Sequence, residues 1–140
     1  MIGAILGYKG NQAAAKQAQA VGEFNARVAE NEAKILQTKK TSEDANLRKA
    51  SERTIATQRV ATAASGIEMS GSALEALKDS YMNTQMDALN LAYASDIEQV
   101  AKASEAALSR AEGRARSSAY KTASYQSLLE GAENVYKASS

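Results

Sequence analysis

Carboxylates are the side chains of this sequence most able to bind a metal ion or to transfer protons. The main candidate cluster is Asp79, Asp87, Asp96 and Glu98, at spacings of 8, 9 and 2 residues. Carboxylates that share a metal ion or a proton must converge on one helical face, about three or four residues apart along the helix. Because these spacings do not converge, the cluster is more typical of a solvated helix face than of a catalytic or metal site.

The residue types that the sequence lacks exclude most other catalytic chemistry. Its 140 residues contain no Cys, His, Trp or Pro, and aromatic residues make up 5%. Without Cys there is no disulfide, zinc-thiolate site or thiol nucleophile, and without His there is no imidazole base. Neither a glycine-rich phosphate loop nor a nucleophile elbow is present. We therefore expect no enzymatic activity, no cofactor and no metal site.

A basic patch near the end of the chain is the main candidate for contact with an anionic partner. Residues 106–121 carry four bases and one acid. The patch could contact DNA phosphates or acidic lipid headgroups, or it could lie on a solvated or partner-facing surface. Because the whole chain has a net charge of only +1, we expect any contact with DNA to be weak or indirect. The bases of the patch are Arg110, Arg114, Arg116 and Lys121.

An apolar segment, residues 1–8, is a candidate for contact with lipid or with a protein partner. Gly3 and Gly7 have the spacing that lets helices pack closely. Such a segment covers roughly 12 Å of helix, against roughly 30 Å for the hydrocarbon core, so one copy cannot span a membrane. The alternative is a terminus that packs against the chain itself. The candidate contact residues are Ile2, Gly3, Ile5, Leu6, Gly7 and Tyr8.

The composition predicts that helices carry all of these residues. Hydrophobic residues make up 44% of the chain, but alanine, the best helix former, supplies about half of them. Acid-to-base pairs four residues apart recur in the orientation that favours a helix. An all-α fold with few large core side chains follows. The pairs are Glu30 with Lys34, Asp44 with Arg48, Glu98 with Lys102, Glu112 with Arg116, and Glu133 with Lys137.

One clear break divides the chain into two helical arms. Gly66 fits the left-handed position that ends a helix, and Ser72 with Glu75 forms a capping-box sequence that begins the next helix, just after Gly71. Stop and start signals this close together predict a long antiparallel hairpin. The chain is then a single elongated helical domain. Its parts are an apolar segment at 1–10, a first arm at 11–64, a turn at 65–72 and a second arm at 73–138.

The arms carry patterns that favour assembly. A stripe of mostly apolar residues with an 11-residue period runs along the second arm, as in a nearly straight or slightly right-handed helical bundle. Residues 39–44 of the first arm resemble a helix boundary, so we expect a kink or short break there. Residues 39–59 carry a net +3 and residues 78–98 a net −3, which favours pairing either between the arms or between copies. Because a two-helix hairpin buries only one face of each arm, we expect an oligomeric helical bundle or ring. The stripe comprises Met82, Met86, Leu89, Tyr93, Ile97, Val100, Ser104, Leu108, Ala111, Ala115, Ala119 and Thr122.

Several segments together resemble the internal virion proteins of short-tailed phages. They are the Gly/Ala-rich opening, residues 10–20, a polar helix with Asn25 and Asn31, and Asp87-Ala88-Leu89 with Tyr93. The most telling segment is the turn, Ala64-Ser65-Gly66-Ile67-Glu68-Met69-Ser70-Gly71-Ser72-Ala73. The chain is similar to the smallest of these core, or ejection, proteins, and the resemblance spans most of its length.

This resemblance implies a structural protein stored inside the capsid near the portal. Such a protein leaves with the genome and helps to form a conduit for DNA across the host cell envelope. The implied partners are further copies of the chain, the other core proteins, the portal and the host outer membrane. The alternative is a generic helical scaffold or adaptor, such as a secretion-filament or particle-coat subunit, without a membrane role.

Overall fold

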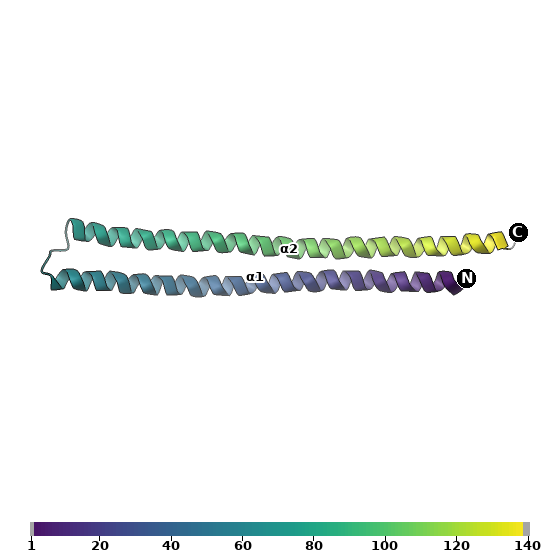
Figure 1. Cartoon of the computed structure of the whole chain (residues 1–140), viewed down its shortest axis with the longest axis horizontal. Coiled ribbons are helices and arrows are strands. Elements are labelled where there is room, and N and C mark those ends of the chain that lie inside the picture. The colour runs from purple at the N-terminus through teal and green to yellow at the C-terminus, as the bar shows by residue number, and fades with distance from the viewer. Residues whose placement is uncertain (1, 139–140) are drawn as a thin grey trace. The chain divides into compact units, whose positions relative to one another are not determined.

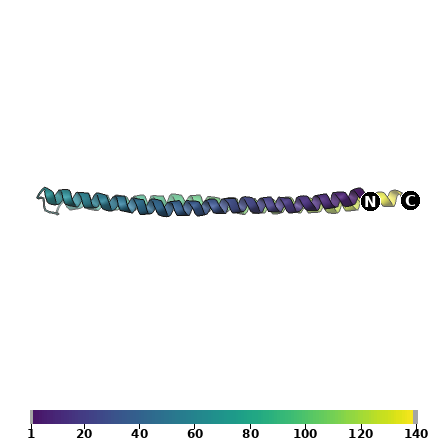
Figure 2. The same cartoon turned by 90° about the horizontal axis from the view of Figure 1, so that it is seen from below.

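The chain forms an antiparallel hairpin of two long helices. The computed structural model describes residues 2–138, with side chains from residue 3 onward. α1 (Ile2–Ala64) and α2 (Ser72–Ala138) are joined by residues 65–71, and residues 2–138 contain no strand. Figures 1 and 2 show the two helices packed against each other. The all-α hairpin predicted from the sequence is thus confirmed, whereas the oligomeric bundle or ring stays a prediction.

The reversal between the helices is built on two glycines. Gly66 and Gly71 have φ values of 72° and 55°, in the left-handed region that side chains disfavour. α2 begins at Ser72, but in the described structure no hydrogen bond joins Ser72 to Glu75, so the predicted capping box does not form. Instead the Glu75 amide donates to the Gly71 carbonyl at 3.1 Å. Gly71 therefore occupies the capping position that the sequence pattern assigned to Ser72.

The short break, one of the two alternatives expected at residues 39–44, does not occur, because α1 is helical without interruption from Ile2 to Ala64, whereas the kink stays a prediction. The Thr41 hydroxyl donates to the Gln37 carbonyl at 3.0 Å, so it joins the helix instead of capping a new one. Lys39 and Glu43 form an ion pair one turn apart. The hydroxyl and charged groups that resembled a helix boundary thus bond within the helix instead. In addition, no Gly or Pro is present there to end the helix.

α1 also includes the segment that the sequence set apart as residues 1–10; Met1 lies outside the described residues. Three glycines weaken helix formation there, each by about 1 kcal/mol relative to alanine. Packing against α2 compensates: Gly7 lies against Ser127, and Gly131 lies so close to Ala4 that a Cβ at Gly131 would overlap it. The contact with α2 explains why the helix continues through a glycine-rich sequence.

The hairpin divides into two compact units, each formed by parts of both helices. We call Met1–Glu32 with Lys102–Ser140 the terminal unit, and Ala33–Ala101 the turn unit. At the open end of the terminal unit, α2 extends past the start of α1 (Figure 2).

Burial differs sharply between the two units. Among the described side chains, every buried apolar residue lies in the terminal unit, and all of them are alanines. In the turn unit Ser95 is the one buried residue, and the apolar side chains that face the other helix are only half-buried. The buried alanines are Ala15, Ala26, Ala29 and Ala106.

Candidate functional site

Small residues form most of the face of each helix that contacts the other in the terminal unit, and in the turn unit this face also includes half-buried leucines. In α2 the positions that are buried or half-buried recur every 11 residues, the period that the sequence showed for the apolar stripe. An 11-residue period keeps one face of a straight helix against its partner over many turns. We call this the packed face. On α2 its most regular members are Ser80, Leu91, Lys102, Gly113 and Ser124, and on α1 they are Ala18, Ala29, Lys40, Ser51 and Thr62.

The large apolar residues of the predicted stripe lie on the opposite face of α2. Leu89 and Val100 are 63% and 66% exposed, and Tyr93 is 71% exposed. A helix turns by about 100° per residue, so Leu89 and Leu91 point to opposite sides although they are two positions apart. The stripe therefore does not hold the hairpin together, which leaves pairing between copies as the alternative that the sequence had kept open. We call these residues the outer stripe: Met82, Met86, Leu89, Tyr93, Ile97, Val100 and Leu108.

α1 also points its largest apolar side chains away from α2. Phe24 and Ile35 are each 67% exposed, and Val60 is 68% exposed. A shallow, open groove of about 590 Å³ lies beside Ile35 on this outward face, between side chains of α1 alone. Both helices thus present large apolar residues outward. The groove is lined by Lys34, Ile35, Thr38, Lys39, Ser42 and Glu43.

The closest approach of the helices in the terminal unit is at Gly22 and Gly113. A Cβ added to Gly22 would lie 2.6 Å from the Ser109 carbonyl oxygen and 2.7 Å from the Gly113 Cα. A Cβ added to Gly113 would lie 2.9 Å from the Gly22 Cα. No ordinary Cβ contact is that short, so only glycine at both positions allows this spacing of the backbones.

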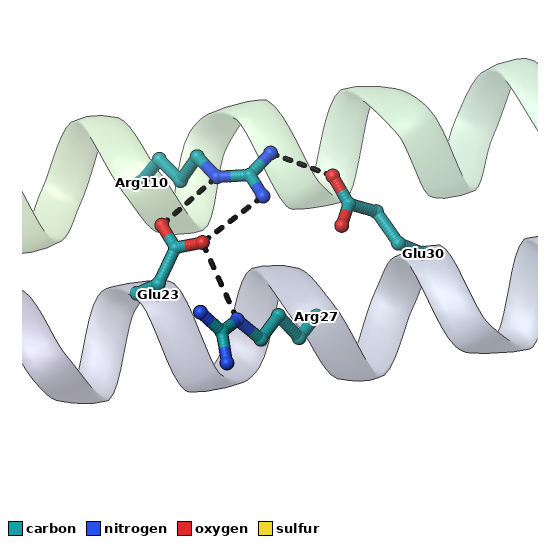
Figure 3. Close-up of polar contacts among 4 residues, drawn as sticks. All are labelled: Glu23, Arg27, Glu30 and Arg110. Carbon is teal, nitrogen blue, oxygen red and sulfur yellow. Dashed lines mark hydrogen bonds and ion pairs between the residues drawn. The ribbon is translucent and has the colours of Figure 1, made fainter.

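A cluster of charged residues near Gly22 and Gly113 joins α1 to α2 (Figure 3). Arg110 on α2 donates from Nε and Nη2 to the two carboxylate oxygens of Glu23, at 3.0 and 3.2 Å. Its Nη1 donates to Glu30 Oε1 at 2.7 Å. Arg27 on α1 adds an ion pair to the Glu23 carboxylate. The planar guanidinium bridges two carboxylates about two turns apart, a geometry that lysine cannot reproduce.

The pKa values in the terminal unit reflect these contacts. The hydrogen bonds from Arg110 lower the pKa of the Glu23 carboxyl below its ordinary value of 4.5, against the opposing effect of desolvation. Hydrogen bonds to Glu23 and then Glu30 raise the pKa of Arg110. Hydrogen bonds to Glu32 and then Glu105 raise the pKa of Lys102, whose Nζ lies 2.6 and 2.9 Å from their oxygens. The contacts thus favour the charged forms of Glu23, Arg110 and Lys102, which act in structural ion pairs.

The predicted basic patch is only partly exposed to a partner. Arg110 is held by Glu23 and Glu30 in the hairpin, so its guanidinium is not presented to a phosphate. The ion pair of Arg116 with Glu112 is 4.0 Å long and leaves the Arg116 side chain 71% exposed, so the exposed bases of the patch are Arg114, Arg116 and Lys121.

One face of the predicted apolar contact segment is occupied by α2. The Tyr8 and Tyr125 rings lie 6.4 Å apart in a tilted arrangement, and the Gln12 side-chain amide donates to the Tyr8 hydroxyl at 3.4 Å. Ile5 and Leu6 are 47% and 65% exposed, and Gly3 has open space around its Cα. The side chain of Ile2 lies outside the described part of the chain. Ile5 and Leu6 are therefore the residues of this segment that a partner can reach.

The predicted carboxylate cluster does not come together. Asp96 accepts from Lys40 at 2.8 Å in a cross-helix ion pair, and Asp79, Asp87 and Glu98 are exposed. Within residues 2–138 no group of three or more side chains could hold a metal ion.

Sequence reasoning missed Gly22, Gly113 and the pairing of Glu23 with Arg110. The two glycines stand alone in helical sequence and were not connected to each other. The detectable signal was the 11-residue recurrence of Ala, Ser and Gly, which marks a face for close helix packing. The ion pairs required the register of α1 against α2, since the partners are 87 residues apart.

Comparisons with known proteins do not assign the chain to a family. No protein-family model, curated protein or solved structure matches it. No helix within the described residues is both long and apolar enough to cross a membrane.

Proposed function

We propose that the chain is a structural subunit that assembles with further copies of itself into a helical bundle or ring. The observation that carries this proposal is the outward position of the large apolar residues on both helices. Monomeric proteins rarely expose apolar patches of more than a few hundred Å², and larger patches mark interaction sites. Assembly would bury these residues, which the hairpin alone leaves in water.

Sedimentation velocity on the purified chain tests this proposal. We expect a concentration-dependent oligomer at tens of micromolar, with an increase in helical circular dichroism as it forms. A folded monomer over this range of concentrations would contradict the proposal.

We further propose that this assembly belongs to the core of a phage virion and is ejected with the genome to help form the DNA conduit. The resemblance of the sequence to internal virion proteins supports this proposal. A second support is the composition of the packed face, because a hairpin held by Ala, Gly and Ser can unfold for passage through a narrow tail and refold afterwards. Its refolding would involve neither disulfide exchange nor proline isomerisation, since Cys and Pro are absent.

Mass spectrometry of purified virus particles, before and after DNA release is triggered in vitro, tests the virion role. We expect the chain in full particles and its loss from emptied ones. Retention in emptied particles would contradict ejection. An assembling chain that never enters particles would instead be the scaffold or adaptor.

The envelope step would use the exposed side of the N-terminal segment, Ile5 and Leu6. Flotation with liposomes compares the full chain with a variant that lacks residues 1–10. We expect the full chain to float and the shortened chain to remain in solution. Equal flotation of both would remove this role from the segment.

A further inference from the structure

The two helices of the turn unit carry opposite net charge. Residues 33–64 of α1 contain seven bases and three acids, whereas residues 72–101 of α2 contain one base and five acids. Among the described residues, Lys40 with Asp96 is the one ion pair that joins α1 to α2 in this unit. Most of the charge that favours pairing of the two helices is therefore exposed rather than used inside the hairpin. The exposed bases include Lys34, Lys39, Lys49 and Arg53, and the exposed acids include Glu75, Asp79 and Asp87.

This charge separation decides which surfaces can meet in an assembly. If α2 packed through its outer stripe against α2 of a second copy, two helices of net negative charge would lie side by side. If it packed against α1, a net negative helix would lie beside a net positive one, and like-charge repulsion would be avoided. The favoured contact is therefore between two different faces, which is a heterologous interface.

The register of the hairpin then shows which residues would meet. Lys40 pairs with Asp96, so Ile35 and Val100, each about one turn further from the loop, lie at the same level of α1 and α2. Ile35 is the centre of the open groove on α1, and Val100 belongs to the outer stripe. At another level Ser51 bonds to Thr84 at 2.8 Å, which puts Arg53 within about one turn of the level of Asp79.

We propose that the outer stripe of α2 packs into the groove around Ile35 on α1 of a second copy, with the hairpin turns of both copies at the same end. This inference rests on the proposed assembly and specifies its interface. In this arrangement Ile35 of one copy and Val100 of the next lie at the same level. Each copy then has one α1 face and one α2 face to offer, so the contact repeats from copy to copy, and it forms a ring where the rotation between copies closes.

Engineered cysteines test the contact directly, because the chain has none of its own. Ile35→Cys and Val100→Cys are made singly and oxidised alone or mixed. We expect efficient disulfide-linked dimers only in the mixture, and a ladder of higher multimers from the double variant. The two positions point to opposite sides of one hairpin, so they cannot bond within a chain.

Ile35→Cys mixed with Met82→Cys is the matched control. Met82 lies on the same stripe but roughly 27 Å further along α2, so this mixture is expected to form few dimers. Circular dichroism of each variant checks that the helices are intact.

Each other outcome overturns a different statement. If Val100→Cys alone gave as many disulfide-linked dimers as the mixture, the contact would be between two outer stripes, and our interface would be overturned. No specific cross-link in a chain that sediments as an oligomer would overturn the interface but leave the proposed function standing. A wild-type chain that remains monomeric would overturn both the interface and the proposed assembly. A monomer that binds liposomes through the outer stripe would instead assign this face to a membrane surface.

Charge reversal gives a second, independent measurement. Lys49→Glu with Arg53→Glu is expected to weaken association at least about tenfold. Adding Glu75→Lys with Asp79→Lys is expected to restore it to within about threefold, because acids and bases have then exchanged places. If the first pair of substitutions leaves association unchanged, or if the second pair does not restore it, the result would count against the contact.

Discussion

In the terminal unit α1 and α2 meet through alanine and glycine, whereas in the turn unit they meet through leucine, serine, threonine and glutamine. The terminal unit holds all the buried alanines and the contact of Gly22 with Gly113. The turn unit has half-buried side chains and a groove of about 320 Å³ near Ile55 and Leu77. Larger side chains thus give looser packing here, because they hold the backbones apart without filling the space between them.

The ion pairs between the helices also differ between the terminal unit and the turn unit. In the terminal unit Arg110 and Lys102 each bond across the hairpin and bridge two carboxylates. In the described turn unit the one cross-helix ion pair is Lys40 with Asp96. The terminal unit therefore uses more of its charges in ion pairs between the helices than the turn unit does. We conclude that the terminal unit sets the register of the hairpin and that the turn unit is the better suited to assembly.

Gly22→Val is expected to have the largest effect, since it forces apart the closest contact of the terminal unit. Overpacking of this kind costs about 3 kcal/mol of unfolding free energy. Native-state hydrogen exchange is expected to show faster exchange in residues 15–29 and 106–117, with little change in the turn unit. The control is Gly10→Ala, which has no atom within 4 Å of the new Cβ and is expected to stabilise α1 by about 0.5–1 kcal/mol. Equal effects of the two substitutions would contradict the close contact.

Leu89→Gln and Leu91→Gln form the next pair, because they test which face of α2 is packed in the turn unit. Leu89→Gln is expected to leave the unfolding of the dilute chain unchanged and to weaken association by about tenfold, given about 1.5 kcal/mol for a large side chain that becomes buried. Leu91→Gln is expected to lower the stability of the hairpin itself. Urea titration and sedimentation measure the two effects. The reverse pattern would place the outer stripe between the helices.

Acidification is expected to weaken the terminal unit through Glu23. The pKa of Glu23 is lower in the folded hairpin than its ordinary value of 4.5, so the unfolded chain binds more protons between the two values. The stabilisation is therefore complete above pH 4.5 and is lost as the pH falls through the folded pKa. Urea midpoints measured across this range are expected to fall in the wild type. They are expected to fall less in Arg110→Met, and identical slopes in both proteins would show that this contact is not the cause.

Gln58→Leu is expected to have the smallest effect, a stabilisation of the turn unit by about 1 kcal/mol. Within the described residues the buried Gln58 Oε1 accepts no hydrogen bond, although Nε2 donates to the Ser80 hydroxyl at 3.1 Å. Removal of a buried acceptor that lacks a donor recovers its desolvation cost. Slower hydrogen exchange near residues 55–62 would be the supporting result, and faster exchange would show that the amide is satisfied in solution.

The helical class, the position of the turn and the 11-residue period were predictable from the sequence. Helix propensity, the glycines at 66 and 71, and the spacing of small and large residues are local properties that act within one or two turns. The break at 39–44 was wrongly predicted because the same Lys, Thr and acidic residues that resemble a boundary also bond along an unbroken helix. The capping box failed for a similar reason, since Gly71 takes the position one residue earlier.

Which face of each helix would be packed was decided only by the tertiary structure. Both faces of α2 have the same period, so periodicity cannot distinguish the small residues from the outer stripe. In the terminal unit glycine and alanine permit close contact of the two backbones, which places the small residues between the helices. The pairing of Arg110 with Glu23 and Glu30 follows from the register that this packing imposes, because residues far apart in sequence become neighbours only once the two helices lie side by side.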